Sequence, residues 1–209
     1  FADCEAVGDA GTHGTGFSAN TATNVKWVNC MARGMSEGHG FTAYQCVNVS
    51  WVSCWAYDNG DIGFNVEESL HAFYDSCYSG GEATLGDDPF PYAAGTSLGN
   101  TGSGFVVNGC ARARLVNCTG YKNGESGLTV VAGSASYGAC SGRVVGCNFT
   151  HNTFAGISIV GTTVVPQWQI SSDTTCTNNT ETPYDLPTGY THGPGSTGAH
   201  QPLLPAPSI

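Results

Sequence analysis

The segment Asn24-Val-Lys-Trp-Val-Asn-Cys30 is one copy of a unit that recurs along the chain. Each later copy again ends in a cysteine, with small or apolar residues five and three positions before it. The later copies are Val49-Ser-Trp-Val-Ser-Cys54, Ala72-Phe-Tyr-Asp-Ser-Cys77, Ala113-Arg-Leu-Val-Asn-Cys118 and Gly142-Arg-Val-Val-Gly-Cys147. Self-similarity with a period of about 20 to 50 residues is typical of repeat architectures.

Alignment of the copies on their cysteines produces columns of similar residues. The columns five and three positions before the cysteine are apolar or small, whereas the column between them is mostly polar. This alternation predicts a β-strand with one buried face. A turn-forming residue stands directly before each cysteine, which predicts a bend there. The members of this last column are Asn29, Ser53, Ser76, Asn117 and Gly146.

A second strand is expected wherever a glycine precedes a large apolar residue. These pairs are Gly16-Phe17, Gly40-Phe41, Gly63-Phe64, Gly104-Phe105, Gly127-Leu128 and Gly156-Ile157. The large residue and the residue two positions later are expected to point inward, and the others outward. Two or three short strands per repeat, without a helical segment, predict an all-β fold that stacks as a parallel β-helix of about six to seven coils. A β-sandwich is the alternative, but it would not align cysteines and phenylalanines in columns.

The solenoid is expected to cover residues 1–176, with a loop insertion at 78–104. The interval between Cys77 and Cys118 is about 18 residues too long for one coil, and insertions in solenoids often form the binding face. An inert surface loop is the alternative. Residues 177–209 predict an extended Pro/Gly-rich C-terminal tail without a core of its own. The chain begins with the end of a repeat, which predicts that it is a fragment of a longer protein.

Ten cysteines would usually indicate the disulfides of a secreted protein, but their spacing indicates otherwise. Stacking in one column predicts buried free thiols that pack as small hydrophobic residues. Cys110 and Cys140 are the pair best placed for a disulfide, because they are expected in adjacent coils. No CxxC pair is present, which disfavours a zinc site. The expected column contains Cys4, Cys30, Cys54, Cys77, Cys118 and Cys147, with Cys176 as a weaker seventh member.

The charge balance restricts the classes of partner. The net charge is -10, and the chain has only six Lys and Arg residues. Such a chain has no electrostatic footprint for nucleic acid or for an anionic membrane. No run of 18 apolar residues exists, so no membrane insertion is expected. A negatively charged polymer would be repelled unless local positive charge or a metal ion intervenes.

The repeated Asn-Val-x-x-x-Asn-Cys-x-Ala, Asp/Lys-Asn-Gly and Gly-Phe units resemble the right-handed parallel β-helix superfamily. This superfamily includes pectate lyases, polygalacturonases, alginate epimerases and bacteriophage tailspikes. The resemblance covers about residues 1–176 and is specific for fold rather than for a reaction. The chain looks most like part of a tailspike or of a related secreted polysaccharide-processing protein. That likeness implies an extracellular or virion-associated homotrimer that binds or cuts a cell-surface polysaccharide.

Candidate catalytic carboxylates lie in the coil that precedes the insertion. Glu67 is expected to point outward between Tyr44 and Asn108 of the neighbouring coils. Asp75 occupies a column that is otherwise held by valines. Hydrolysis of a glycosidic bond needs two carboxyl groups about 5–10 Å apart, so Glu67 with Asp61 or Asp75 is the predicted catalytic pair. Crowding of carboxylates would raise the pKa of one of them toward that of an acid catalyst. Solvated surface carboxylates are the alternative interpretation.

The predicted substrate-binding residues are Tyr44, Asn65, Asn108, His71 and His39. His39 belongs to a Gly-His-Gly tripeptide, which polygalacturonases also contain. The Asp-Asp before it and the Arg-x-Lys after it in that family are missing here. No cofactor is expected, with calcium bound by Asp58 and Asp61 as the alternative to a plain surface turn.

Two further columns have alternative readings. Lys26, Arg114 and Arg143 share a column, which is either a basic stripe for an anionic glycan or a set of exposed strand positions. Trp27, Trp51 and Tyr74 share another, which we expect to be core rather than a sugar-stacking platform.

Two functions remain open at this point. The first is a carbohydrate-binding or polysaccharide-degrading β-helix, a tailspike-type depolymerase that is a glycosidase rather than a lyase. The second is a non-catalytic structural or receptor-binding β-helix of a virion fibre or surface adhesin. The acidic coil and the insertion favour the first function, whereas the absence of a complete catalytic motif favours the second.

Overall fold

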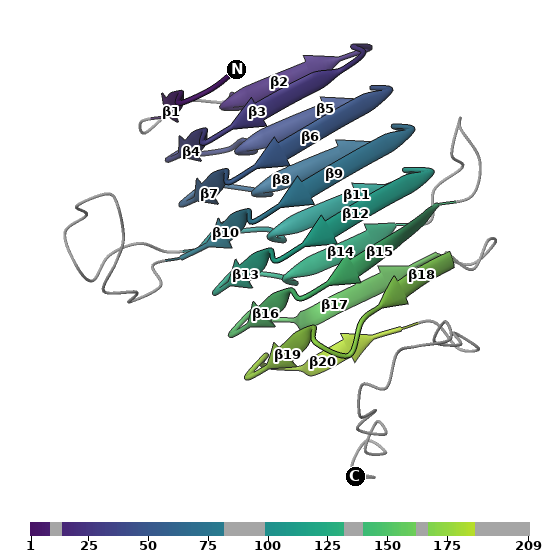
Figure 1. The fold of residues 1–209 in the computed structure, drawn as a ribbon. Coiled ribbons are helices and arrows are strands. Elements are labelled where there is room, and N and C mark those ends of the chain that lie inside the picture. Colours follow the sequence, from purple (N-terminus) through teal and green to yellow (C-terminus); the bar gives the residue numbers. More distant parts are fainter. Residues whose placement is uncertain (9–13, 82–98, 132–139, 162–166, 187–209) are drawn as a thin grey trace, which may run out of the picture.

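The structure, a computed structural model, describes residues 1–8, 14–81, 99–131, 140–161 and 167–186. Every regular element in these ranges is a β-strand, and the paired strands run parallel. The strands form three sheets, here called A, B and C, around which the chain winds as a rod with the first coil at one end and the last at the other (Figure 1). No helix in these ranges is long and apolar enough to cross a membrane.

Each coil contributes one strand to sheet C, then one to sheet A, then one to sheet B. Sheet C contains β2 (Phe17–Asn20), β5 (Phe41–Tyr44), β8 (Phe64–Glu67), β11 (Phe105–Asn108), β14 (Leu128–Val131), β17 (Ala155–Val160) and β20 (Thr182–Asp185). Sheet A contains β3 (Val25–Val28), β6 (Asn48–Val52), β9 (His71–Asp75), β12 (Arg112–Val116), β15 (Ser141–Val145) and β18 (Gln167–Ile170). Sheet B contains β1 (Glu5–Val7), β4 (Met31–Arg33), β7 (Trp55–Tyr57), β10 (Tyr78–Gly80), β13 (Thr119–Tyr121), β16 (Asn148–Thr150) and β19 (Thr175–Thr177).

These three sheets make a parallel β-solenoid of about six turns. The predicted all-β parallel fold is therefore confirmed. A β-sandwich is excluded, because a sandwich consists of two antiparallel sheets.

Ladders of like side chains fill the interior. Trp27, Trp51 and Tyr74 stack with ring centroids 5.4 and 4.5 Å apart. The phenylalanines of sheet C stack at 4.8 to 5.0 Å, which is close to the spacing of adjacent strands. The two ladders meet edge to face, as Trp51 and Phe64 do at 6.3 Å, an arrangement that aromatic quadrupoles favour. The tryptophans and Tyr74 are core residues, as predicted.

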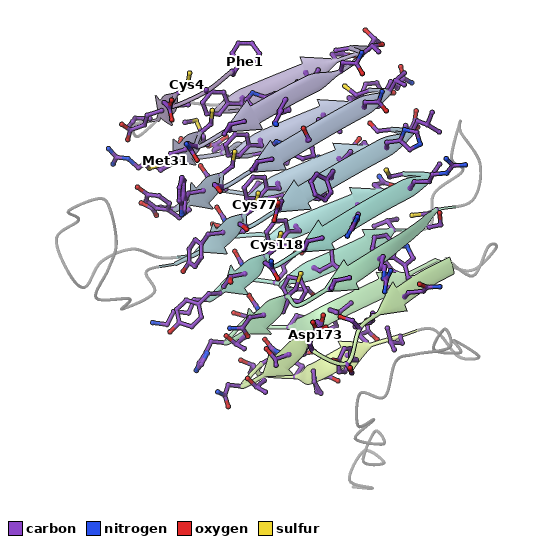
Figure 2. All side chains as sticks on the ribbon, in the orientation of Figure 1. Phe1, Cys4, Met31, Cys77, Cys118 and Asp173 are labelled. Carbon is purple, nitrogen blue, oxygen red and sulfur yellow. The ribbon has the colours of Figure 1, made fainter. Side chains whose placement is uncertain are left out.

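A single left-handed residue turns the chain from sheet A into sheet B. The turn formers that precede the cysteines have φ between +50° and +60°, so the predicted bend is confirmed. Asn and Gly tolerate this conformation better than other residues do. The next residue, the cysteine, then points inward, and Figure 2 shows Cys77 and Cys118 on successive coils. All ten cysteines are free thiols, so the disulfide considered for Cys110 and Cys140 is not formed.

Cys176 is not a seventh member of the cysteine column. It pairs in register with Phe149, in the next inward column of sheet B. Thr174 takes the place of the cysteine, and its hydroxyl accepts a hydrogen bond from the Cys147 amide at 3.4 Å. The last coil repeats after 27 residues, as the pairing of Asn148 with Thr175 shows, rather than after the 29 residues that separate the two cysteines.

A ladder of buried asparagines forms the corner between sheets B and C. Each side-chain amide donates a hydrogen bond to the carbonyl oxygen of the next, at 2.8 to 3.1 Å. The rungs are Asn59, Asn100, Asn123, Asn152 and Asn179. The sequence interpretation of Asp58-Asn-Gly60 and Lys122-Asn-Gly124 as turns missed this ladder. In both segments a left-handed residue, Asp58 or Lys122, precedes an asparagine whose side chain is buried.

The observed strands make the insertion shorter than predicted and continue the solenoid beyond its predicted C-terminal end. Tyr78–Gly80 is a regular strand and Asn100 is a regular rung, so the insertion lies between them, and 82–98 lie outside the described residues. At the other end, β19 and β20 continue the sheets past residue 176 as far as Asp185. The rest of the expected tail, 187–209, is outside the described ranges as well.

Candidate functional site

The outward-pointing residues of sheet C form a surface that contains four of the predicted site residues. We call this surface the C face, and its members on β5, β8, β11 and β14 are Thr42, Tyr44, Asn65, Glu67, Val106, Asn108, Thr129 and Val131. The register places Glu67 directly between Tyr44 and Asn108, as predicted. Four of the predicted site residues are therefore brought together on three adjacent strands.

Asn65 is an outward-pointing residue that is nonetheless buried. Its neighbours on the strand, Phe64 and Val66, are core residues, so the pleat directs Asn65 away from the interior. Its exposed fraction is only 2%. Its amide nitrogen donates a hydrogen bond to the Glu67 carboxylate at 2.9 Å, which fixes that carboxylate against the sheet.

Two acceptor atoms of the C face lack partners. The side-chain oxygens of Asn65 and of Thr42, which pairs with it in register, are buried and make no hydrogen bond within the described structure. A buried polar atom without a partner costs about 1–3 kcal/mol. Such atoms are uncommon in folded proteins and call for a physical reason. Here they lie beside a carboxylate, on the outer side of the solenoid.

A second carboxylate, Glu68, stands beside Glu67 at the corner that leads to sheet A. It accepts a hydrogen bond from the side-chain amide of Gln45 at 3.0 Å, and the same amide reaches the Tyr44 hydroxyl at 3.1 Å. The sequence interpretation missed Gln45 as a possible site residue, and it placed Glu68 in the acidic cluster without giving it a role. Their separation of 23 residues, one coil, was the available signal, because it places them in one column.

Asp61 and Asp75, the predicted partners of Glu67, lie at the far ends of their strands. Asp61 precedes β8 and Glu67 ends it, and the four residues of β8 alone span about 10 Å. Asp75 ends β9, about 13 Å of strand beyond the corner that follows Glu67. The structure therefore does not place either aspartate beside Glu67, and the catalytic pair remains a prediction.

His39 and Asp61 meet at the corner between sheets B and C. Nδ1 of His39 accepts a hydrogen bond from the Ile62 amide at 3.4 Å and lies 3.4 Å from an Asp61 carboxylate oxygen. Both contacts involve Nδ1 and hold the imidazole at this corner.

His71 lies on sheet A, away from the C face. Its Nδ1 donates to the Asn48 carbonyl oxygen at 2.7 Å, and its Nε2 lies 3.3 Å from a guanidinium nitrogen of Arg112. A neutral imidazole satisfies both contacts. His71 therefore belongs with the arginines of sheet A rather than with Glu67.

The two aspartates considered for calcium have different neighbours. Asp58 is close enough to Arg33 for the guanidinium to lower its carboxyl pKa, although burial, the larger effect, raises that pKa overall. Asp61 faces His39. No group of three or more His, Cys, Asp or Glu side chains suited to a metal ion occurs in the part of the chain that the structure describes.

Comparisons with protein-family models, with curated proteins and with solved structures find no match to this chain. What the structure supports of the resemblance described above is the parallel β-solenoid itself. No match supports a relationship to tailspikes or pectate lyases, so that relationship stays a prediction.

Proposed function

We propose that this solenoid binds a polysaccharide along the C face and that Glu67 acts as the acid in cleavage of a glycosidic bond. The observation that carries the proposal is Asn65. It is buried on the outer side of a strand, it fixes the Glu67 carboxylate, and its carbonyl oxygen has no partner among the described residues. The partly exposed Glu67 carboxylate and the Tyr44 ring beside it offer the contacts for a sugar.

Charge on this surface favours a neutral glycan or an amino sugar. The acidic residues on the strands of the C face or directly beside them, from β5 to β14, are Glu37, Asp61, Glu67, Glu68 and Glu125. The six Lys and Arg residues lie on sheets A and B or directly after β13. A lyase must neutralise the carboxylate of a uronic acid, and no Lys or Arg residue lies on the strands of the C face. Hydrolysis therefore fits this surface better than elimination does.

Binding without cleavage is the second candidate function. It is favoured by the distances along the strands, which leave Asp61 and Asp75 away from Glu67. In that case the solenoid serves as a receptor-binding or structural part of a virion fibre or adhesin. Both functions retain the proposal of an extracellular or virion-associated homotrimer, which rests on the resemblance to tailspikes alone.

The test is a screen of neutral and amino-sugar polysaccharides for binding and for release of reducing ends. Glu67→Gln should keep binding and lower product release at least about 100-fold, because an acid catalyst typically contributes 10²–10⁴. Asn65→Ala should weaken binding. Glu5→Gln, an exposed position on β1 of sheet B, is the matched control and should change neither.

Two outcomes separate the alternatives. Binding without product release by the unmodified protein would select the non-catalytic function, and full turnover by the Glu67→Gln protein would remove Glu67 from the mechanism. If no glycan binds, or if Asn65→Ala leaves binding unchanged, the C face is not the glycan site.

A further inference from the structure

The outer side of sheet A gathers most of the positive charge of an acidic protein. Four of the six Lys and Arg residues point outward from its strands, and all four are exposed. They are Lys26 on β3, Arg112 and Arg114 on β12, and Arg143 on β15. The net charge of the chain is -10, so an even distribution of its charged residues would leave every face acidic. The gathering of cations on sheet A departs from that distribution.

The arginines are placed where they repel one another. Arg114 pairs directly with Arg143 in register, so the two side chains stand on adjacent strands about 4.8 Å apart at the backbone. Arg112 lies two residues before Arg114, on the same side of the same strand. Like charges opposite each other destabilise a sheet. No ion pair offsets this repulsion, since none of the four cations has a carboxylate within 4.0 Å in the described ranges.

Aromatic rings, rather than acids, support two of the guanidinium groups. Arg114 lies over the ring of Phe73 at 5.8 Å, and Arg112 contacts the imidazole of His71. Asp75 lies on β9 of this sheet, and Asp173 is close enough to Arg143 for their charges to interact, although the two do not form an ion pair within 4.0 Å. Asp75 accepts a hydrogen bond from Ser76, and Asp173 accepts bonds from Ser171 and the Gly146 amide. These contacts therefore orient the guanidinium groups and leave N–H donors available to a ligand.

We propose that Arg112, Arg114 and Arg143 form a binding site for the anionic groups of a sulfated or carboxylated polysaccharide, separate from the C face. Guanidinium groups bind sulfate and carboxylate oxygens through paired hydrogen bonds. Repetition of the cations along the rod suits a ligand that is itself a repeating polymer. Because the site lies on a different sheet, it does not depend on the function proposed for Glu67.

Calorimetric titration of the full chain with three oligosaccharides tests the site. The probes are heparin, which carries sulfate and carboxylate, oligogalacturonate, which carries carboxylate only, and neutral dextran. Heparin or oligogalacturonate should bind, with an affinity that falls as salt is added, and dextran should not bind at this site. The double variant Arg114→Gln/Arg143→Gln should weaken binding of the anionic probe at least about tenfold.

Matched controls separate this site from general charge effects. Arg33→Gln removes one positive charge from sheet B, where Arg33 pairs with Glu5 at 2.8 Å, and should leave binding unchanged. The double Arg→Lys variant at positions 114 and 143 retains the charge and folding but loses the paired geometry, so it should bind with intermediate affinity. Product release or neutral-glycan binding at the C face should be the same in all of these proteins.

The proposal is overturned if neither anionic probe binds, or if the Arg→Gln double variant binds as tightly as the unmodified protein. The competing occupant of this surface is a second copy of the chain. Sedimentation of the same proteins measures their oligomeric state and so tests for it. If the double variant dissociates an oligomer and no anionic probe binds the unmodified protein, sheet A is a subunit interface instead.

Discussion

At the scale of the single residue, Tyr74 has a hydroxyl that the solenoid buries without a partner. The side chain is completely buried, and its ring stacks on Trp51 at 4.5 Å. The hydroxyl makes no hydrogen bond within the described structure, and burial raises its pKa well above the usual value. Tryptophan and leucine occupy the same column, so the position needs a large apolar body and not a polar group.

Tyr74→Phe should therefore raise the free energy of unfolding by about 1 kcal/mol, because it removes a desolvated hydroxyl and keeps the ring. Urea denaturation followed by tryptophan fluorescence measures the change. Tyr121→Phe, at a half-buried position of sheet B, is the control and should stay within about 0.5 kcal/mol of the unmodified protein. A loss of stability for Tyr74→Phe would mean that an internal water or a rearranged neighbour satisfies the hydroxyl.

At the scale of the element, the asparagine ladder ties successive coils together at one corner. Asn123 occupies its middle, where it accepts a hydrogen bond from Asn100 and donates to both Asn152 and the carbonyl of Ser79. Elsewhere the strand ladders of the three sheets and backbone hydrogen bonds at the corners hold the coils together. Removal of one rung therefore leaves buried amide and carbonyl groups without hydrogen-bond partners. The strands cannot supply replacements.

Asn123→Leu should lower the free energy of unfolding by about 3 kcal/mol, since several buried polar groups lose their partners at once. Asn20→Ala, an exposed outward position on β2, is the matched control and should change stability by less than about 0.5 kcal/mol. Chemical denaturation of the two variants measures both values. Equal effects of the two substitutions would show that the ladder contributes little.

The same elements show what the sequence could predict. Strands and their inward residues follow from alternation and from the repeat, because stacking places like residues in one column. Asn59 and Asn123 could not be read as buried, since Asn-Gly after a polar residue is also a common surface turn. Glu67 between Tyr44 and Asn108 was predictable from register. The pairing of His71 with Arg112 was predictable in the same way, because each stands six positions before its cysteine, although the sequence interpretation grouped His71 with Glu67 instead.

At the scale of the whole molecule, the outer faces of the sheets differ in charge, whereas the interior contains cysteines along the whole rod. Sheet A carries most of the cations, and the C face and its borders carry acids. Inside, nine of the ten cysteines are buried and extend over all the coils, with only Cys4 partly exposed. Burial raises the pKa of Cys30, Cys110, Cys140 and Cys176, so these four thiols stay neutral at physiological pH.

This thiol-rich interior predicts a loss of stability at alkaline pH. Burial raises the pKa of Cys110 and of Cys176 to about 12, whereas an unfolded cysteine has a pKa of about 8.5. A pKa that is raised on folding gives stability that is complete below about pH 8.5 and is lost as the pH rises toward 12. Each of the two thiols should lower the free energy of unfolding by roughly 1.4 kcal/mol per pH unit in that window.

Denaturation midpoints at closely spaced pH values between neutral and alkaline measure this slope. Cys110→Ala should reduce the slope even though the smaller side chain lowers stability at neutral pH, because one titrating group is removed. Val107→Ala, at a buried position without an ionisable group, is the control: it should lower stability at neutral pH but leave the slope unchanged. The interpretation fails if stability is flat up to pH 10, or if Cys110→Ala and the unmodified protein lose stability with equal slopes.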